Sequence, residues 1–136
     1  MPENIVASLQ NLIVPIDSVH LDSRNVRKHP EANLSALKLS LETYGQRKPI
    51  IVNQDGAIEA GNGLWMAAKA LGWDKIAVVR VNDDKRTAEA YGLMDNQSAL
   101  ISEWDFPRLK DMLEGLDTGG FNMDLTGFSQ KEIERL

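Results

Sequence analysis

The chain has 136 residues, of which 43% are hydrophobic and 26% are charged, with a formal net charge of −5 and no cysteine. This length suits one domain-sized core, and the composition is that of a folded soluble protein rather than a disordered or membrane protein. The lack of cysteine excludes disulfides, thiolate metal sites and thiol nucleophiles, and the acidic total makes any nucleic-acid contact depend on a local basic patch.

The start of the chain lacks the basic segment and long apolar run of an export signal, and nowhere do eighteen apolar residues follow one another. We therefore expect a cytoplasmic protein without a membrane span. No internal repeat or low-complexity tract interrupts the sequence.

The first predicted elements are a short strand and a helix. β-Branched residues between 12 and 21 indicate a strand, and Pro15, which cannot donate to a strand ladder, places that strand at a sheet edge. Pro30 suits the first turn of a helix, in which leucines recur at helical spacing until Gly45 supplies a stop.

A hairpin and a second helix follow. Short strands in 48–53 and 57–60 flank an Asp-Gly dipeptide, which is typical of hairpin turns. Helix-forming residues occupy 64–71, and a glycine directly after them favours a helix end there. The apolar run in 75–82 then predicts a strand that is buried on both faces.

The C-terminal part is predicted to be helical, with helices over 85–100 and 105–116 and a last helix capped by Ser129. We expect an α/β (α+β) fold: a small mixed β-sheet flanked by helices, with a helical C-terminal part. The domain is predicted to span 1–118, and 119–136 to form a linker and a C-terminal helix.

The sequence AGNG lies between a predicted strand and a predicted helix. Backbone N–H groups at a helix start attract phosphate or carboxylate, and Gly61 and Gly63 permit close approach of a ligand, while Asn62 can donate or accept. The alternative is a tight strand-to-helix turn that binds nothing.

Two acidic residues are candidates for catalysis. Glu59 directly precedes the turn and would act as a general base or metal ligand if it faced a pocket, although the exposed side of a hairpin strand is the interpretation we favour for it. Asp95, next to Asn96, pairs a carboxylate with an amide, which suits Mg²⁺. The alternative for Asn96 is that it bonds only to neighbouring backbone groups.

Five basic residues lie in two short stretches, 24–28 and 47–48, despite the acidic total of the chain. They would form a local cationic surface for polyphosphate or a nucleic-acid backbone, and the alternative is that they are solvated loop charges. They are Arg24, Arg27, Lys28, Arg47 and Lys48.

The order of these motifs resembles the N-terminal domain of the ParB and sulfiredoxin superfamily, in the ParB-like branch common in phage and mobile-element proteins. The likeness begins near Ile16 and includes YGQRKPI, DG, IEAGNG, AAKALGW and MDNQ. It implies that Gly61–Gly63 contact nucleotide phosphates, that Gln46 and Lys48 line the same pocket, and that Asp95 and Asn96 hold a metal ion.

The resemblance implies a domain that binds a nucleotide or DNA phosphate in a DNA-linked process such as partition, modification or phage DNA metabolism. A nucleoside triphosphate and Mg²⁺ are the implied cofactors. DNA, a DNA methyltransferase or another DNA-modifying module, and a second copy in a homodimer are the implied partners. Arg24, Arg27, Lys28 and Arg47 are the candidate nucleic-acid contacts.

The chain also departs from that family. Chromosome-partitioning members carry GERR in the turn, whereas this chain has GNGL, so the guanidinium that would bind phosphate is missing. Two other functions therefore remain open. One is a Mg²⁺-dependent enzyme, either a nuclease, a nucleotide hydrolase or a small-metabolite kinase, that uses Glu59 or Asp95. The other is a non-catalytic protein-interaction adaptor.

Overall fold

The computed structural model describes residues 4–22 and 28–136. By internal packing the chain divides into two compact units, residues 1–97 and 98–136. The sequence pattern predicted a first domain over 1–118, with the helix over 105–116 as part of it. Across the described residues, no helix is long and apolar enough to cross a membrane.

The first unit is built on a four-stranded mixed sheet with the order β1-β4-β2-β3. The strands are β1 (Ile13–Pro15), β2 (Ile50–Asn53), β3 (Ile58–Ala60) and β4 (Lys75–Val81). β4 pairs with β2 in parallel and with β1 antiparallel, and β2 and β3 form the expected antiparallel hairpin. β1, with Pro15, lies at the edge as predicted. The mixed fold class is thereby confirmed.

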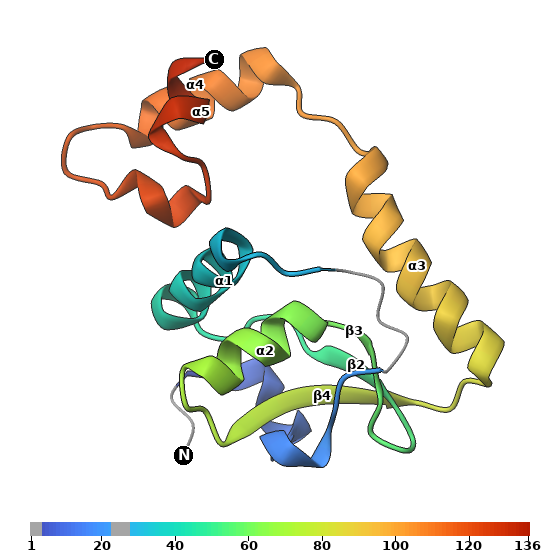
Figure 1. The fold of residues 1–136 in the computed structure, drawn as a ribbon. Helices are drawn as coiled ribbons and strands as arrows, with labels where there is room; N and C mark the ends of the chain where they lie inside the picture. Colours follow the sequence, from blue (N-terminus) through green and yellow to red (C-terminus); the bar gives the residue numbers. More distant parts are fainter. Residues whose placement is uncertain (1–3, 23–27) are drawn as a thin grey trace. The chain divides into compact units, whose positions relative to one another are not determined.

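Two helices cover one face of this sheet (Figure 1), α1 (Glu31–Tyr44) and α2 (Asn62–Ala70). The main core lies between them and the strands, where side chains such as Leu41, Ile50 and Ile76 are almost fully buried. Ala77 points to the other face, which is covered by the 3-10 helix η1 (Ala7–Leu12). This alternation along β4 confirms the prediction of a strand buried on both faces.

Two glycines end the helices of the first unit as expected. Gly45 follows α1 with φ 73° and donates its N–H to Leu41 O, and Gly72 follows α2 with φ 80°. A short 3-10 helix, η2 (Ile16–Ser18), links β1 to a segment in which His20 pairs with Ala57 beside β3. The sequence analysis did not predict either 3-10 helix.

α3 (Lys85–Ile101) begins in the first unit, where Ala88 is buried, and continues past residue 97. The second unit contains α4 (Phe106–Leu116), the 3-10 helix η3 (Met123–Thr126) and α5 (Gln130–Glu134). Asp105 caps α4 by accepting from Arg108 N, and Ser129 forms a capping box with Glu132 at the start of α5. Both caps confirm the predicted helix starts.

Candidate functional site

A pocket of about 290 Å³ opens at the turn between β3 and α2. We call it the turn pocket. Its walls come from His29, from Asn33 and Leu37 on α1, from the segment 59–64, and from Asp95 and Asn96 on α3. Segments far apart in the sequence therefore meet at the glycine turn.

The turn itself has the conformation that the glycines predict. Gly61 is the residue before α2, and its φ of 107° lies in the left-handed region that favours glycine. No side chain caps the start of α2. The first N–H groups of a helix have no hydrogen-bond partner within it. Those of α2 are therefore available to an anionic ligand at the turn.

Residues of the turn-pocket wall carry buried polar atoms without a hydrogen-bond partner. Among the described residues four such side-chain atoms occur, and three belong to residues of the pocket wall: His29 Nε2, Glu59 Oε1 and Asn62 Oδ1. A buried polar atom without a partner costs on the order of 1–3 kcal/mol, and most native folds avoid it. Glu59 also lines a second pocket, with Asn53 and Asp83, so His29 Nε2 and Asn62 Oδ1 are the two atoms that favour a ligand at the turn pocket itself.

Glu59 is buried, with only 7% of its surface exposed, so the favoured expectation of an exposed hairpin position is wrong. The reason is tertiary packing: the backbone of Gly92 on α3 lies against Glu59 O, close enough that a Cβ atom at residue 92 would come within 2.9 Å. Asn53 Nδ2 donates to Glu59 Oε2 at 3.1 Å.

The carboxyl of Glu59 is unusual because burial raises its pKa from 4.5 to about 7. The neighbouring carboxyl of Asp83 adds to this increase of the pKa, Asp22 contributes a smaller repulsion, and the hydrogen bond from Asn53 opposes it. The protonated carboxyl of Glu59 donates a hydrogen bond to the neighbouring carboxyl of Asp83, whereas the ionised carboxyl requires a cation or a donor.

Asp95 and Asn96 both reach the wall of the turn pocket, as their predicted role requires. Asp95 is exposed, and Asn96 Nδ2 donates to Gly92 O at 3.1 Å. The backbone role that we held as the alternative for Asn96 thus occupies its nitrogen, and its side-chain oxygen is the atom suited to a cation. Among the described residues, no three His, Asp or Glu side chains form a ready metal cluster.

The structure gives the side chain of Gln46 a different role from the predicted one. It is fully buried, donates to Lys48 O and Ala77 O, and accepts from Ala77 N, each at 2.9 Å. Because its amide is fully used in holding β4 to the segment after α1, Gln46 has no donor left for phosphate and does not line the turn pocket. We therefore correct its expected ligand role to a structural one.

Lys48 and Arg47 also lie outside the described lining of the turn pocket. They follow α1, whose 14 residues extend about 21 Å at 1.5 Å per residue, whereas His29 precedes it. Arg47 Nε donates to Tyr44 O, and its guanidinium stacks on the ring of Tyr44 at 5.2 Å. The predicted single cationic surface around the turn is thus not assembled from these two residues.

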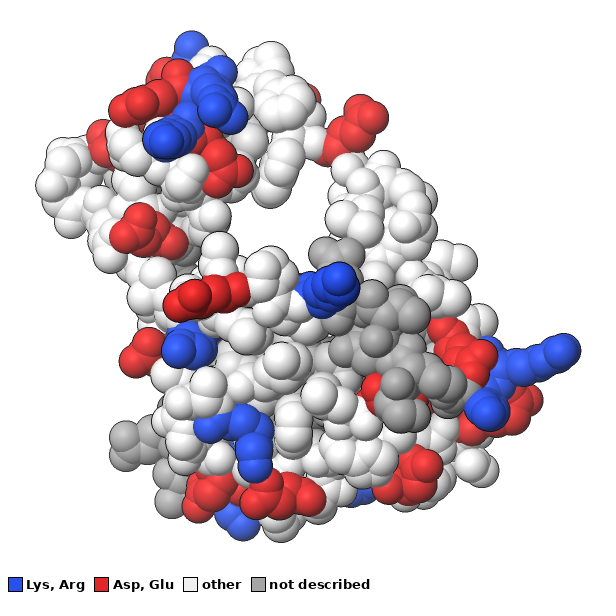
Figure 2. Space-filling view, viewed as in Figure 1, with Lys and Arg blue, Asp and Glu red and all other residues white. Residues whose placement is uncertain are grey.

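Lys28 is exposed and precedes His29 of the pocket wall, whereas Arg24 and Arg27 lie outside the described residues. On the face in Figure 2, lysines and arginines lie among acidic side chains and form no continuous basic patch over the described residues. In the described lining of the turn pocket there is no lysine or arginine.

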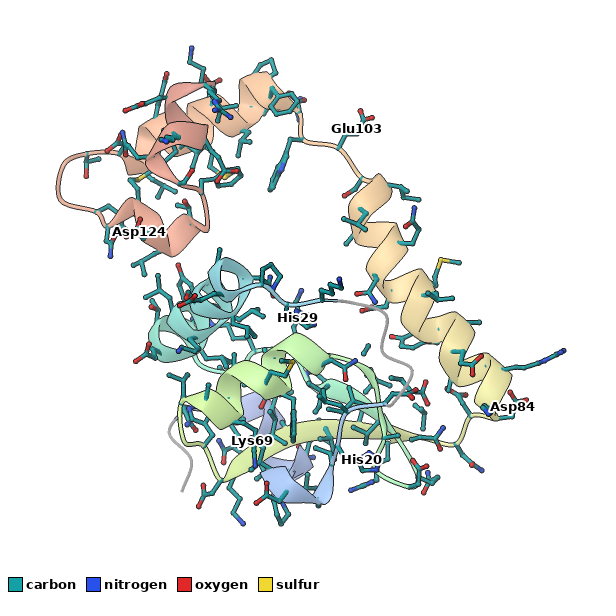
Figure 3. The ribbon with its side chains drawn as sticks, in the orientation of Figure 1. His20, His29, Lys69, Asp84, Glu103 and Asp124 are labelled. Carbon is teal, nitrogen blue, oxygen red and sulfur yellow. The ribbon has the colours of Figure 1, made fainter. Side chains whose placement is uncertain are left out.

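His29 and Asn33 are pocket residues that the sequence analysis did not select. His29 belongs to the segment leading into α1 (Figure 3), and its ring lies against Gly63 at the start of α2. Its Nδ1 lies 2.8 Å from Asn33 Oδ1. A histidine four residues before an asparagine at a helix start was the available signal.

Comparisons with known proteins agree with this architecture. The profile of the ParB N-terminal domain matches residues 4–97. The ParB-like nuclease domain-containing protein YnaK of Escherichia coli (strain K12) is 29% identical over 65 residues, which cover 48% of this chain and 75% of YnaK.

Solved structures of ParB proteins share the fold. A C-terminally truncated chromosome-partitioning protein ParB from Caulobacter crescentus, in complex with CTP-gamma-S, has a TM-score of 0.73 at 18% identity and covers 89% of this chain and 73% of its own. The same protein with the centromeric parS site has a TM-score of 0.54 at 18% identity, with coverages of 90% and 62%. Because the family profile matches well over half of the chain, the chain belongs to the ParB N-terminal domain family.

Proposed function

We propose that the turn pocket binds the phosphate groups of a nucleoside triphosphate together with Mg²⁺. The observation that carries this proposal is the gathering of three partnerless buried polar atoms, on His29, Glu59 and Asn62, around an uncapped helix start. Phosphate oxygens only accept hydrogen bonds, so Mg²⁺ and its waters would be the partners of Glu59 Oε1 and Asn62 Oδ1, and a phosphate oxygen would pair with His29 Nε2 when that nitrogen carries a hydrogen.

The start of α2 provides the phosphate-binding half of the pocket. Gly61 and Gly63 carry no side chain of their own, and no side-chain cap competes for the amides that follow. The helix dipole places partial positive charge there, which favours an anionic oxygen. α2 has nine residues, long enough for this effect.

The acidic half of the pocket explains the need for a metal ion. Glu59 and Asp95 both line it, and two carboxylates beside a polyphosphate repel it unless a cation lies between them. Mg²⁺ typically takes one or two protein carboxylates together with substrate phosphates and keeps several waters. The lack of a ready three-ligand cluster among the described residues fits this mode of binding. Asp95, Asn96 and Glu59 are the residues that would hold the ion, and bound Mg²⁺ would neutralise phosphate charge.

CTP is the first nucleotide to test, because the Caulobacter ParB structure with TM-score 0.73 was determined with a CTP analogue. The proposal extends to a DNA-linked process such as partition, modification or phage DNA metabolism, since the same protein was also crystallised with parS. A phage or mobile-element origin, a DNA methyltransferase partner and a homodimer remain parts of the proposal that rest on the sequence resemblance.

The test is a calorimetric and thermal-shift panel of CTP, UTP, ATP and GTP, each with and without Mg²⁺. A ligand that binds only the native state raises the melting temperature, so at least one triphosphate is expected to do so and to require Mg²⁺ for full affinity. Asn62→Leu and Asp95→Asn should each weaken binding about tenfold.

Lys48→Ala is the matched control, because Lys48 is exposed and lies outside the described pocket lining. It should leave the affinity unchanged. If Lys48→Ala abolishes binding while Asn62→Leu does not, the basic segment binds the nucleotide and the turn is only a structural connection. If no triphosphate shifts the melting temperature, the adaptor function becomes the better explanation.

A second candidate function is Mg²⁺-dependent hydrolysis of the bound nucleotide or of a nucleic acid. The observation in its favour is Glu59, whose carboxyl has a pKa of about 7 in a pocket wall, the property of a general base that works near neutral pH. Phosphate-release and DNA-cleavage assays test it. Glu59→Gln should abolish turnover while nucleotide binding persists, and turnover that survives this change would exclude Glu59 as the base.

A further inference from the structure

We infer that His29 is the side chain that contacts an anionic oxygen of the ligand in the turn pocket. This inference rests on the proposed function of the pocket. It assigns to His29, from the segment before α1, the contact that the turn cannot make because Gly63 has no side chain.

The first observation is that His29 fills the space above Gly63. A Cβ atom built on Gly63 would come within 2.7 Å of His29 Cε1 and 2.9 Å of His29 Nδ1. Real Cβ atoms are not found so close to a ring, so residue 63 cannot carry a side chain while the imidazole stays in place. Residues 29 and 63 thus share one volume, and the imidazole occupies it.

The second observation is the orientation of the ring. His29 Nδ1 lies 2.8 Å from Asn33 Oδ1, an acceptor, so Nδ1 carries the hydrogen and donates. Nε2 is then the atom left for a ligand, and it is buried without a partner. When the ring is protonated, Nε2–H becomes a charge-assisted donor to an anionic oxygen.

The third observation is the charge of the pocket wall. The described lining contains two carboxylates, Glu59 and Asp95, and no lysine or arginine. His29 is the one side chain of that described lining that can carry a positive charge. It lies next to the start of α2, so an oxygen bound by the backbone amides of the turn is within the same small pocket as Nε2.

A binding experiment on the full chain tests this assignment, with CTP and Mg²⁺ as one probe and inorganic triphosphate and Mg²⁺ as the other. His29→Leu keeps similar bulk and removes both ring nitrogens, and it should weaken both probes at least tenfold. His29→Gln retains a neutral donor and should lose less. His20→Gln is the control, because His20 is exposed and bonds to Leu21 O and Asp55 O outside the pocket.

A reciprocal exchange tests the shared volume. Gly63→Arg should weaken binding because the new side chain collides with the imidazole, and the double variant Gly63→Arg with His29→Gly should recover affinity to within a few-fold of the starting chain, since a guanidinium then enters the vacated space. The Nε2 nitrogen resonance of His29 in the unaltered chain gives a readout that does not depend on any variant folding. It should shift on addition of inorganic triphosphate, and that of His20 should not.

The outcomes separate the two proposals. If the unaltered chain binds neither probe, the proposed function fails and the role of His29 fails with it. If it binds CTP and His29→Leu retains affinity within twofold, with a stationary Nε2 resonance, only the His29 assignment is overturned. If His29→Leu loses CTP but not inorganic triphosphate, His29 contacts the nucleoside part, and the assigned contact with an anionic oxygen is wrong.

Discussion

Gly61 lies so close to Ile50 that a Cβ atom at residue 61 would come within 2.4 Å of Ile50 Cγ2. Ile50 is almost fully buried in β2, so it has no space into which to retreat. The φ of 107° at Gly61 adds a second restriction, because other residues rarely adopt it. The turn and the neighbouring strand are therefore fitted to each other.

Gly61→Ala should destabilise the fold by about 2–4 kcal/mol, from the cost of a left-handed backbone together with overpacking against the core. Urea denaturation measures this loss. Gly72→Ala is the matched control, because Gly72 also has a positive φ, of 80°, but nothing lies within 4 Å of its built Cβ atom. A similar loss in both variants would show that packing against Ile50 contributes nothing.

The stability of the first unit should fall as the pH rises from about 4.5 to 7 and then level off, as far as Glu59 contributes. The folded state holds the Glu59 proton more tightly than the unfolded chain does. Below pH 4.5 Glu59 is protonated in both states, and between pH 4.5 and pH 7 it is protonated only in the folded state, so the stabilisation is lost over that range. A shift of this size corresponds to roughly 3 kcal/mol. Glu59→Gln should flatten the profile in denaturant titrations at several pH values, and an unchanged slope would contradict the raised pKa.

Metal-free triphosphate should bind more weakly as the pH passes upward through about 7, because ionised Glu59 then faces the anion from the pocket wall. Mg²⁺ should remove most of this dependence by compensating the carboxylate. Calorimetry at pH 6 and pH 8, with chelator or with Mg²⁺, measures both effects. Between the two values Glu59→Gln should lose less affinity for metal-free triphosphate than the unaltered chain does. Equal binding by the unaltered chain would place the phosphates away from Glu59.

Gln46→Leu should lower the free energy of unfolding by about 2–4 kcal/mol, because it leaves the buried backbone groups of Ala77 without partners. The affinity of the remaining folded protein for CTP should not change, since Gln46 lies outside the described pocket lining. Gln54→Leu is the control, because its exposed amide makes one long hydrogen bond, 3.4 Å to Val81 O. If fully folded Gln46→Leu bound CTP more weakly than the unaltered chain, Gln46 would have a role in ligand binding after all.

Any binding to DNA should weaken as the salt concentration rises, because a chain with a net charge of −5 contacts phosphates only through local cations. Lys28→Ala should reduce the slope of log affinity against log salt by about one if Lys28 contacts a phosphate. Lys131→Ala, on α5 in the second unit, provides the comparison. If Lys28→Ala and Lys131→Ala had equal slopes of log affinity against log salt, Lys28 would not contact DNA phosphate.

Local chemistry made much of the fold predictable from the sequence. Pro30 and Gly45 bound α1, an Asp-Gly dipeptide forms the hairpin turn, and Asp105 and Ser129 cap helices, since each of these choices depends on backbone preferences within a few residues. The glycine turn is also fixed by local backbone preferences, and the positive φ of Gly61 was predictable from its sequence.

What could not be predicted depends on contacts between distant segments. Glu59 alternates with buried Ile58 and therefore looks exposed, but α3 covers it through Gly92, far along the chain. Gln46 likewise meets Ala77 on a different strand. The roles of His29 and Glu59 as pocket residues arise from such packing, which no spacing rule within one element contains.

The partnerless atoms of His29, Glu59 and Asn62 mean that the ligand-free fold carries a built-in penalty. Laboratory evolution that rewards heat resistance alone should replace these three residues early, because apolar side chains there would remove the penalty. The selected variants would be more stable and would bind their ligand more weakly. The residues substituted in such a screen would therefore be those whose polar atoms the ligand contacts. This would hold even before the ligand is identified.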